Sequence, residues 1–410
     1  MKTVPKAAIA ISSSTDSFTA GSEASRSALD QLGSDQDVHL AIVFCTSSLE
    51  AEALTKGIRS VLGPTVLLFG ANANGVISNH FIGYDGFYFG LALLHLPGIN
   101  VKLFSYTGIA FNEAVAGNIL GSLIAPELPD QQENPCLLFL YDSVNRQKKR
   151  FTMNLATPLI DGLNKYLPIS LPIAGSRVMG DMKFNPTSQW CGQDLLKDSA
   201  VALLLSGNLR VYTKVLHGCR PTSAYHRITK ADGPVVLEID ERPALDLIGD
   251  ILGPQLRNDY QQYKFFVTFG VNYGEKWGAF NEDQYANRMC VNVDRNRAGL
   301  VLAEPLAEGT EFQLMRRSFD MDQYRTDTSS LLDEISSDNF VPFFALYLNC
   351  AGRAATYYGS EEEEAAYVAQ GLNNRVPLLG VYEAGEITRI KQDLKLLDWS
   401  GVLLIFSYPL

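Results

Sequence analysis

Apolar runs of strand length alternate with helix-like segments along most of the chain. Because these runs are apolar at consecutive positions, they predict strands that are covered on both faces. Three strands each precede a helix-like segment: 39–48 (HLAIVFCTSS), 136–144 (CLLFLYDSV) and 341–352 (VPFFALYLNCAG), before helices at 49–63, 153–167 and 360–374. In the last helix we expect Ser360 to be the N-cap, since four glutamates follow it where the helix dipole favours acids.

A glycine pattern follows each of these helices. In VPLLGVYEAGEI (376–387), four residues separate two glycines, and an acid comes next. The spacing occurs twice more, in VLLFGANANGVIS (66–78) and LPIAGSRVMGDMK (171–183), so that the pairs are Gly380 and Gly385, Gly70 and Gly75, and Gly175 and Gly180. Further apolar strands follow at 86–96, 198–207 and 401–410. The chain therefore repeats a unit of strand, helix, strand with glycine loop, and strand.

A fourth, less regular unit is predicted near the middle of the chain. The segment 234–253 (PVVLEIDERPALDLIGDILG) reads as strand and helix, and 265–275 (FFVTFGVNYGE) reads as a strand with glycines one residue closer together. The four units would form two related pairs. The polar stretch 217–233 is the best boundary between them.

The predicted fold class is α/β (α+β), with mixed sheets flanked by helices. We expect two related domains, 1–220 and 221–410, the second including the terminal Gly-Glu loop and the last strand. The preferred arrangement stacks the sheets, covers their outer faces with helices, and gathers the glycine loops toward an interdomain cleft. Each glycine would let the backbone or a ligand approach closely, although any single copy is explained as readily by a tight turn.

Composition excludes several classes of protein. The chain has 410 residues, 46% of them hydrophobic and 19% charged, which is enough for sizeable cores. The formal net charge is -11 and the basic residues are scattered, so we expect no nucleic acid partner. No apolar run approaches the ~20 residues of a bilayer crossing, so we expect no membrane insertion.

The cysteines and histidines show no metal-site spacing. Six cysteines form no C-x-x-C pair, which favours a reducing, cytoplasmic location without structural zinc. The five histidines show no H-E-x-x-H pattern, so no metal site is predicted.

The glycine loops do not match a nucleotide-binding motif. A phosphate-binding loop needs Lys and Ser or Thr after its second glycine, and it leads into a helix. Here Val76, Asp181 and Glu386 follow the second glycine, and a strand comes next. Two of these residues are acids, which would repel a phosphate.

Other motifs resemble FIST proteins (F-box and intracellular signal transduction). The segment 217–253 is similar to the junction of the family's two domains, with matches at Gly218, Pro221, Thr229, Gly233, Pro243, Ala244, Leu245, Asp246 and Gly253. The C-terminal FIST domain is resembled by EGTEFQLMRRS (308–318), NCAGR (349–353) and LLGVYEAGEI (378–387). Residues 43–78 are similar to the FIST N domain, except that Ala71 and Val76 replace a cysteine and an acid of its usual loop.

The resemblance implies a free-standing, bacterial-type member with a sensory role. Family members are regarded as modules that bind small ligands, with amino acids suggested, and some resemble haem proteins that sense nitric oxide. We therefore expect a non-catalytic sensor without a resident cofactor. It would pass the binding event to a separate signalling protein of the kinase or cyclase class.

Arg353 and Glu386 lead the candidate ligand-binding residues. A guanidinium suits a carboxylate and an acid suits an ammonium group, so together they would hold a zwitterion such as an amino acid. The alternative is that the two side chains pair with each other. The full candidate set is Arg353, Glu386, Asn349, Cys350, Gly380, Gly385, Tyr382, Gly175, Arg177, Gly180, Asp181, Gly70, Asn72, Asn74 and Gly75.

Three other functions remain open from the sequence. A haem-based nitric oxide sensor would use His226 or His80 as its axial ligand. A thiol-dependent enzyme would use Cys350 as nucleophile. An adaptor would bind only protein.

Overall fold

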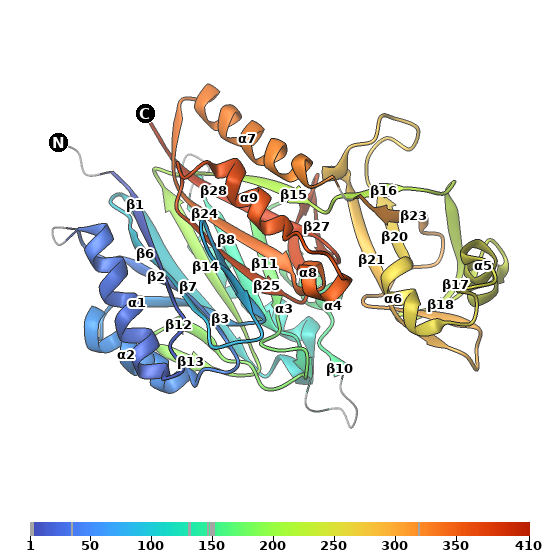
Figure 1. The fold of residues 1–410 in the computed structure, drawn as a ribbon, viewed down its shortest axis with the longest axis horizontal. Helices are drawn as coiled ribbons and strands as arrows, with labels where there is room; N and C mark the ends of the chain where they lie inside the picture. Colours follow the sequence, from blue (N-terminus) through green and yellow to red (C-terminus); the bar gives the residue numbers. More distant parts are fainter. Residues whose placement is uncertain (1–3, 34–35, 130–132, 146, 148–151, 319) are drawn as a thin grey trace.

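The structure is a computed structural model that describes residues 4–33, 36–129, 133–145, 147, 152–318 and 320–410. The chain forms two bodies that lie side by side in Figure 1. The larger body contains three six-stranded sheets and the helices that cover them. The smaller body, which we call the inserted sheet, is built from residues 219–317. No helix in the described part of the chain combines the length and the apolar character needed to cross a membrane.

The three large sheets share one strand pattern. The first runs β1 (Lys6–Ser12), β6 (Phe89–His95), β2 (Leu40–Thr46), β3 (Leu67–Ala73), β12 (Gln189–Gly192), β13 (Asp194–Leu196). The second runs β7 (Ile99–Thr107), β14 (Ser199–Gly207), β8 (Cys136–Asp142), β11 (Ile173–Val178), β26 (Glu386–Ile390), β27 (Asp393–Leu397). The third runs β15 (Arg210–Leu216), β28 (Gly401–Pro409), β24 (Phe340–Cys350), β25 (Leu378–Glu383), β4 (Gly75–Ser78), β5 (Ile82–Tyr84).

Each sheet contains one parallel pair among antiparallel neighbours. The parallel pairs are β2 with β3, β8 with β11, and β24 with β25. In every case the first glycine of the loop pattern lies in the second strand, opposite Val43, Phe139 or Tyr347 of the first. The sequence repeat is therefore a structural repeat, and the sheets define a first, a second and a third copy.

The three repeats exchange hairpins in a cycle. After its glycine loop, each repeat sends a two-stranded hairpin into the sheet of another repeat. The hairpin β4–β5 of the first repeat joins the third sheet, β12–β13 of the second joins the first, and β26–β27 of the third joins the second. Strands of both predicted domains thus share sheets, and the boundary at residue 220 stays a prediction.

A pair of helices covers the outer face of each sheet. The pairs are α1 (Ser17–Leu32) with α2 (Ala51–Leu62), α3 (Glu113–Ile124) with α4 (Ala156–Asn164), and α7 (Met321–Ser337) with α9 (Glu364–Leu372). Small residues let each pair approach closely. A Cβ at Gly21, Gly117 or Gly371 would overlap a carbonyl oxygen of the partner helix, and Thr328 occupies the α7 position that matches Gly21 and Gly117.

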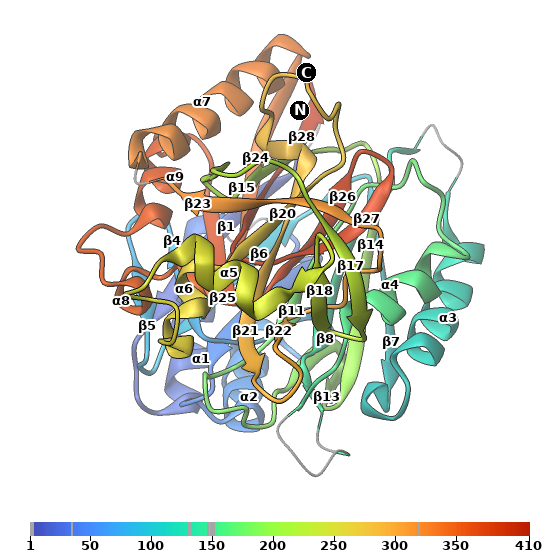
Figure 2. The same ribbon diagram turned by 90° about the vertical axis from the view of Figure 1, so that its right-hand side faces the viewer.

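The cores follow this layering. A central core takes residues from the inward faces of all three sheets, including Phe44, Leu140 and Leu348. Separate cores fill the space between each sheet and its helices, and Figure 2 shows the helices on the outside of the sheets. Short elements complete this body: β9 (Val144–Asn145), β10 (Thr152–Met153), α8 (Ala355–Tyr358) and 3-10 turns at Ile109–Phe111, Ala125–Glu127 and Ala351–Arg353.

The inserted sheet replaces the predicted fourth unit. Its strands run β16 (Cys219–Pro221), β23 (Glu311–Arg317), β17 (His226–Asp232), β18 (Val235–Ile239), β22 (Gly299–Leu302), β21 (Tyr285–Asp294), β20 (Thr268–Asn272), with β19 (Arg242–Pro243) beside β18. It also holds α5 (Ala244–Leu252), α6 (Tyr263–Phe266) and 3-10 turns at Tyr260–Gln262 and Glu282–Gln284. Since β18 and β20 are not neighbours and the pairings are antiparallel, the fourth unit was a wrong prediction.

The predicted fold class is confirmed. The sheets are mixed, helices flank them, and the first half of the chain holds two repeats while the second holds one repeat plus the inserted sheet. The predicted cap at Ser360 is wrong, because α9 begins at Glu364 after the N-cap Glu363. The physical reason is that Glu363 and Glu364 bind partners outside their own helix, as described below.

Candidate functional site

The three glycine loops meet at one place, the loop junction. Each loop touches another through its backbone, as the cyclic exchange of hairpins requires. The hydrogen bonds between loops are Asn74 N to Tyr382 O at 2.9 Å and Arg177 N to Gly385 O at 2.8 Å. Gly180 O of the second loop also accepts at 3.4 Å from Ser47 N, just after β2 of the first repeat. The expected gathering of the loops is therefore present.

The first glycine of each loop has a packing role. A Cβ at Gly70 or Gly175 would overlap the carbonyl oxygen of the neighbouring parallel strand, and one at Gly380 would lie 3.0 Å from it. Gly70 also has φ +152°, which side chains rarely adopt. These glycines allow close strand pairing and leave ligand contact to other residues.

The repeats differ in the side chains that they place at the loop junction. Three residues after the first glycine stand Ala73, Val178 and Glu383, and six residues after it stand Val76, Asp181 and Glu386. Ala73, Val178 and Val76 belong to the central core. The third repeat thus places two carboxylates where the first repeat places apolar core residues.

Glu386, Glu383 and Asp398 form what we call the acidic junction. Glu386 is fully buried, and neither of its carboxylate oxygens has a hydrogen-bond partner among the described residues. Glu383 accepts 2.8 Å from Met179 N with one oxygen, and Asp398 accepts 3.2 Å from Met289 N with one oxygen. The other oxygen of each has no partner in the described part of the chain. Four carboxylate oxygens are therefore buried without a hydrogen-bond partner from any residue that the structure describes.

Burial favours the protonated form of all three acids in the acidic junction. It raises the pKa of Glu386 and of Glu383 well above their usual range, and it raises the pKa of Asp398. The negative charges of Asp398 and Glu383 raise the pKa of Glu386 further, whereas Arg353 and Arg177 lower it. A positively charged partner would therefore stabilise the ionised form of these carboxylates and bind favourably to them.

Further polar groups without a partner among the described residues belong to residues that contact the segments carrying the acidic junction. Asp398 N donates to Asn287 O of the inserted sheet at 3.1 Å, and Arg288 donates to Leu396 O. The Asn287 side-chain amide and Arg288 Nε have no partner among the described residues. In the larger body the same holds for the side-chain amides of Asn349 and Asn74. Buried polar groups are normally satisfied, so this concentration is unusual.

Arg353 pairs with Glu364 at 2.5 Å and not with Glu386. Its guanidinium also donates to His217 O at 2.5 Å, to Trp399 O at 2.6 Å and to the Tyr324 hydroxyl at 2.9 Å. Because these contacts occupy most of its donors, Arg353 holds the segment that leads into the inserted sheet. Arg317, where the chain leaves that sheet, pairs with Glu364 as well.

Arg177 is engaged in the same way. It donates to the Tyr141 hydroxyl at 2.9 Å and pairs with Glu304 of the inserted sheet. Glu304 in turn accepts from Ala156 N at 2.8 Å and Thr157 N at 3.2 Å, at the first turn of α4. Arg177 therefore fastens the inserted sheet to the second repeat.

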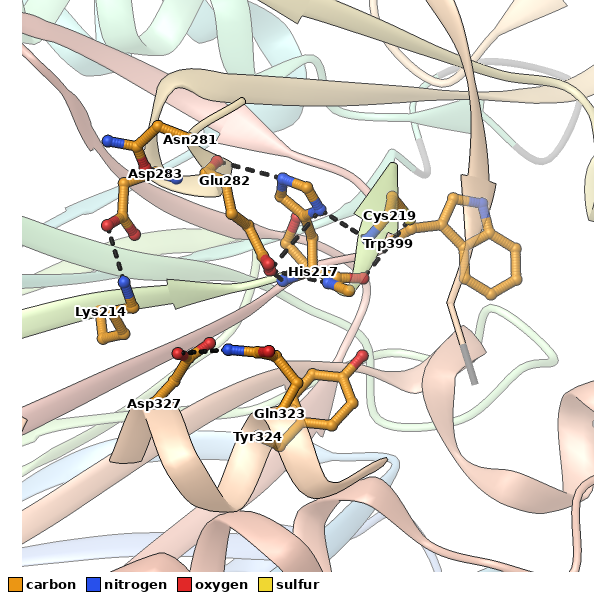
Figure 3. A network of polar contacts seen from close by, with 12 residues as sticks. Lys214, His217, Cys219, Asn281, Glu282, Asp283, Gln323, Tyr324, Asp327 and Trp399 are labelled. Atoms are coloured by element: carbon orange, nitrogen blue, oxygen red, sulfur yellow. Dashed lines mark hydrogen bonds and ion pairs between the residues drawn. The ribbon is translucent and has the colours of Figure 1, made fainter. Parts of the chain in front are cut away.

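A polar network surrounds the entry into the inserted sheet (Figure 3). Cys219 N donates to His217 Nδ1 at 2.9 Å, so Nε2 carries the proton and donates to Glu282 O at 3.1 Å. Glu282 also accepts from the backbone N–H groups of His217 and Gly218. Lys214 pairs with Asp283 at 2.8 Å. Burial lowers the pKa of His217, which favours this neutral form.

The side chains of several predicted site residues are engaged with other protein groups. Asp181 accepts from Lys183 N and Asn185 N in its own turn. Asn72 bonds Ser188 N and the Cys45 sulfur. The Tyr382 hydroxyl donates to Glu363, which also accepts from Ala355 N.

Of the remaining candidates, Gly75 pairs with Tyr382 in the third sheet, and a Cβ at Gly180 would overlap Ser47. Burial raises the pKa of Cys350 to about 12. His80 is exposed, and His226 pairs with Asp240 at 2.7 Å.

Sequence reasoning missed Glu383, Asp398, Arg288 and Asn287. Glu383 had a usable signal, because aligning the three loops places it against Ala73 and Val178. Asp398, Arg288 and Asn287 belong to no motif, and they come close only through the docking of the inserted sheet.

The chain is similar to uncharacterized proteins of two microorganisms. It matches an uncharacterized Mycobacterium tuberculosis protein at 24% identity over 56% of this chain and 59% of that one, and an uncharacterized Methanocaldococcus jannaschii protein at 26% over 48% and 38%. The chain thus matches about three-fifths or less of the length of these relatives.

Two solved structures align along nearly all of the chain. A chorismatase aligns over 98% of both chains with 9% identity and a TM-score of 0.37. A cyanuric acid hydrolase from A. caulinodans aligns over 99% of this chain and 100% of that one, with 8% identity and a TM-score of 0.34.

Family models cover most of the chain. The FIST N domain model matches residues 39–242, and the FIST C domain model matches residues 244–389. FIST domains are sensory domains. The chain belongs to the FIST family.

Proposed function

We propose that this protein is a sensory module that binds a small, positively charged or zwitterionic ligand at the acidic junction. One observation carries the proposal: both oxygens of the buried Glu386 lack a partner among the described residues. Leaving a buried polar group unpaired costs about 1–3 kcal/mol, and more for a charged one. A ligand that donates hydrogen bonds to these unpaired oxygens would offset the cost, which explains why several of them occur together.

The chemistry of the unbound atoms defines the ligand class. Carboxylates accept hydrogen bonds, so Glu386 and Asp398 fit an ammonium or amidinium group. Arg288 has an unbound Nε in the inserted sheet and fits a carboxylate. An amino acid carries both groups. In this proposal Arg288 takes the role that the sequence gave to Arg353.

The position of the site supports a signalling role. The acidic junction lies where the larger body meets the inserted sheet, and polar contacts such as Arg177–Glu304 join the two. Polar interfaces between domains permit relative motion. Ligand that bridges Glu386 and Arg288 would change how firmly the inserted sheet docks, and a separate signalling protein of the kinase or cyclase class would read that change.

The other functions have less support. A nucleophilic cysteine needs a lowered pKa, whereas burial raises that of Cys350. His226 is engaged with Asp240, which disfavours it as a haem ligand. No residue contact favours a pure adaptor over a ligand-binding module.

A thermal-shift screen tests the proposal. Purified protein would be heated with amino acids, small amines and matched uncharged amides, because a ligand that binds only the folded state raises the Tm. We expect amino acids or amines to raise the Tm, the amides to have no effect, and Glu386→Gln to lose the response. Asp181→Asn, at the matching position of the second repeat, is the control and should respond like the wild type. A response that survives Glu386→Gln would refute this site.

A further inference from the structure

The outer face of α3 differs from the matching faces of the other two repeats. Gly117 of α3, Gly21 of α1 and Thr328 of α7 occupy equivalent positions, because each faces the partner helix at its closest approach. Other positions of the three helices can therefore be matched by counting from these residues. The outward positions at -2, +2 and +6 are Val115, Ile119 and Leu123 in α3, Thr19, Glu23 and Ser27 in α1, and Thr326, Ser330 and Glu334 in α7, and all of them except the half-buried Thr19 are exposed.

We call Val115, Ile119 and Leu123 the α3 stripe. Their exposed fractions are 42%, 37% and 47%, whereas Ala116, Leu120 and Ile124 on the inner face of the same helix are fully buried. Figure 2 shows α3 on the outer rim of the molecule. In the same fold position the other repeats carry polar side chains, so the sheet does not require this stripe.

We propose that the α3 stripe is the centre of an isologous dimer interface, where α3 packs antiparallel against α3 of a second copy. Residues at i, i+4 and i+8 of one helix form a line that a two-fold axis through Ile119 maps onto itself, so that Val115 meets Leu123 of the partner. Self-complementarity of this kind is what a two-fold interface needs.

Charge selects a second copy over a membrane surface. Helices that lie on bilayers carry Lys or Arg on the polar face to meet anionic headgroups. The sequence of α3, EAVAGNILGSLI, contains no basic residue, and the chain has a net charge of -11. Two such acidic chains repel each other except where the contact is free of charge, and the α3 stripe is free of charge.

The size of the contact sets the expected affinity. The 12 residues of α3 span about 18 Å, so the stripe supplies an apolar centre smaller than the ~800 Å² per partner of a standard interface. We therefore expect a reversible dimer with a Kd on the order of 10 µM.

Sedimentation velocity across protein concentrations tests the dimer. We expect the wild type to shift from monomer to dimer between about 1 µM and about 100 µM. Ile119→Glu should raise the Kd at least about tenfold, because it would bury two carboxylates at the two-fold axis. The variant should fold normally, since Glu23 occupies this position in α1.

Ser330→Glu is the matched control. It places the same charge at the matching position of α7 and should dimerise like the wild type. A wild type that stays monomeric at about 100 µM would overturn the proposal, as would equal behaviour of the two variants.

Discussion

The glycine loops of the first and third repeats have the same strand register but different side chains. In the first, Ala73 and Val76 are part of the central core. In the third, Glu383 and Glu386 occupy the matching positions and leave three carboxylate oxygens unbound among the described residues. Apolar residues at these positions are thus compatible with the fold. The acids of the third repeat are therefore not needed for folding, and comparing the repeats within one chain distinguishes residues needed for the fold from residues that serve binding.

The largest expected effect concerns what the loops share. Gly70→Ala should destabilise the protein by more than about 3 kcal/mol, because the new Cβ would overlap Val43 O and the backbone has φ +152°. Gly175→Ala should cost less, since its overlap with Phe139 O comes without a positive φ. Gly380→Ala should cost least, with its nearest carbonyl oxygen at 3.0 Å. Urea unfolding of the three variants measures this order, and a reversed order would contradict a shared packing role.

The next effect concerns what differs between the loops. Glu386→Val gives the third repeat the residue of the first, and it removes two unbound oxygens from a buried site. We expect the free energy of unfolding to rise by about 1–3 kcal/mol while ligand binding is lost. Glu383→Ala copies Ala73 and should stabilise less, because one Glu383 oxygen accepts from Met179 N.

Urea unfolding of these variants, beside Asp181→Val at the half-buried matching position of the second repeat, measures the changes in the free energy of unfolding. If Glu386→Val destabilised the protein by several kcal/mol, the carboxylate would have a structural partner and the comparison would fail.

A smaller effect is the pH dependence of Asp142, a buried acid of the second repeat. Burial raises its pKa from 3.8 to about 6, so the folded state binds more protons than the unfolded state between these values. Its stabilising contribution is complete below about pH 4 and is lost as the pH rises through about 6. Asp142→Asn should flatten the curve of unfolding free energy against pH in this window. An unchanged curve would show that Asp142 ionises normally.

The smallest effect concerns His217 at the entry to the inserted sheet. Burial lowers its pKa from 6.5, so its contribution is complete above that pH and is lost as the pH falls through the lower, folded value. Protonation removes the acceptor that Cys219 N uses. The protection factors of the amides in the segment 217–221, which are corrected for the intrinsic exchange rate at each pH, should therefore fall in mild acid. Substitution of an exposed histidine in His80→Gln should leave this fall unchanged, whereas His217→Asn should abolish it.

The sequence predicted the repeat and the meeting of its loops well. The strands around Phe44, Leu140 and Leu348 are apolar at consecutive positions because both faces are covered, which is a strong local signal. The cyclic exchange of hairpins could not be predicted, since strands such as β4 and β26 pair with partners about 300 and 210 residues away in the chain.

The candidate site was predicted only in part. Glu386, named from its glycine loop, stays a proposed ligand residue. Arg353, named beside it, pairs with Glu364 and donates to His217 O at the entry to the inserted sheet. The spacing of motifs in the sequence does not tell which of several buried acids an arginine will pair with. Arg288 and Asp398 come together through docking of two bodies, and that contact leaves no local pattern in either segment.

The most direct test of the central claim is a proton count on ligand binding. Isothermal titration calorimetry of the best ligand from the thermal-shift screen, repeated in buffers of different ionisation enthalpy, measures the protons exchanged. A cationic group that pairs with Glu386 would lower its raised pKa, so we predict the release of up to about one proton per ligand, and no binding by Glu386→Gln at the same ligand concentrations. Binding without proton release, or with equal release from Glu386→Gln, would contradict the assignment of the buried acid as the ligand's partner.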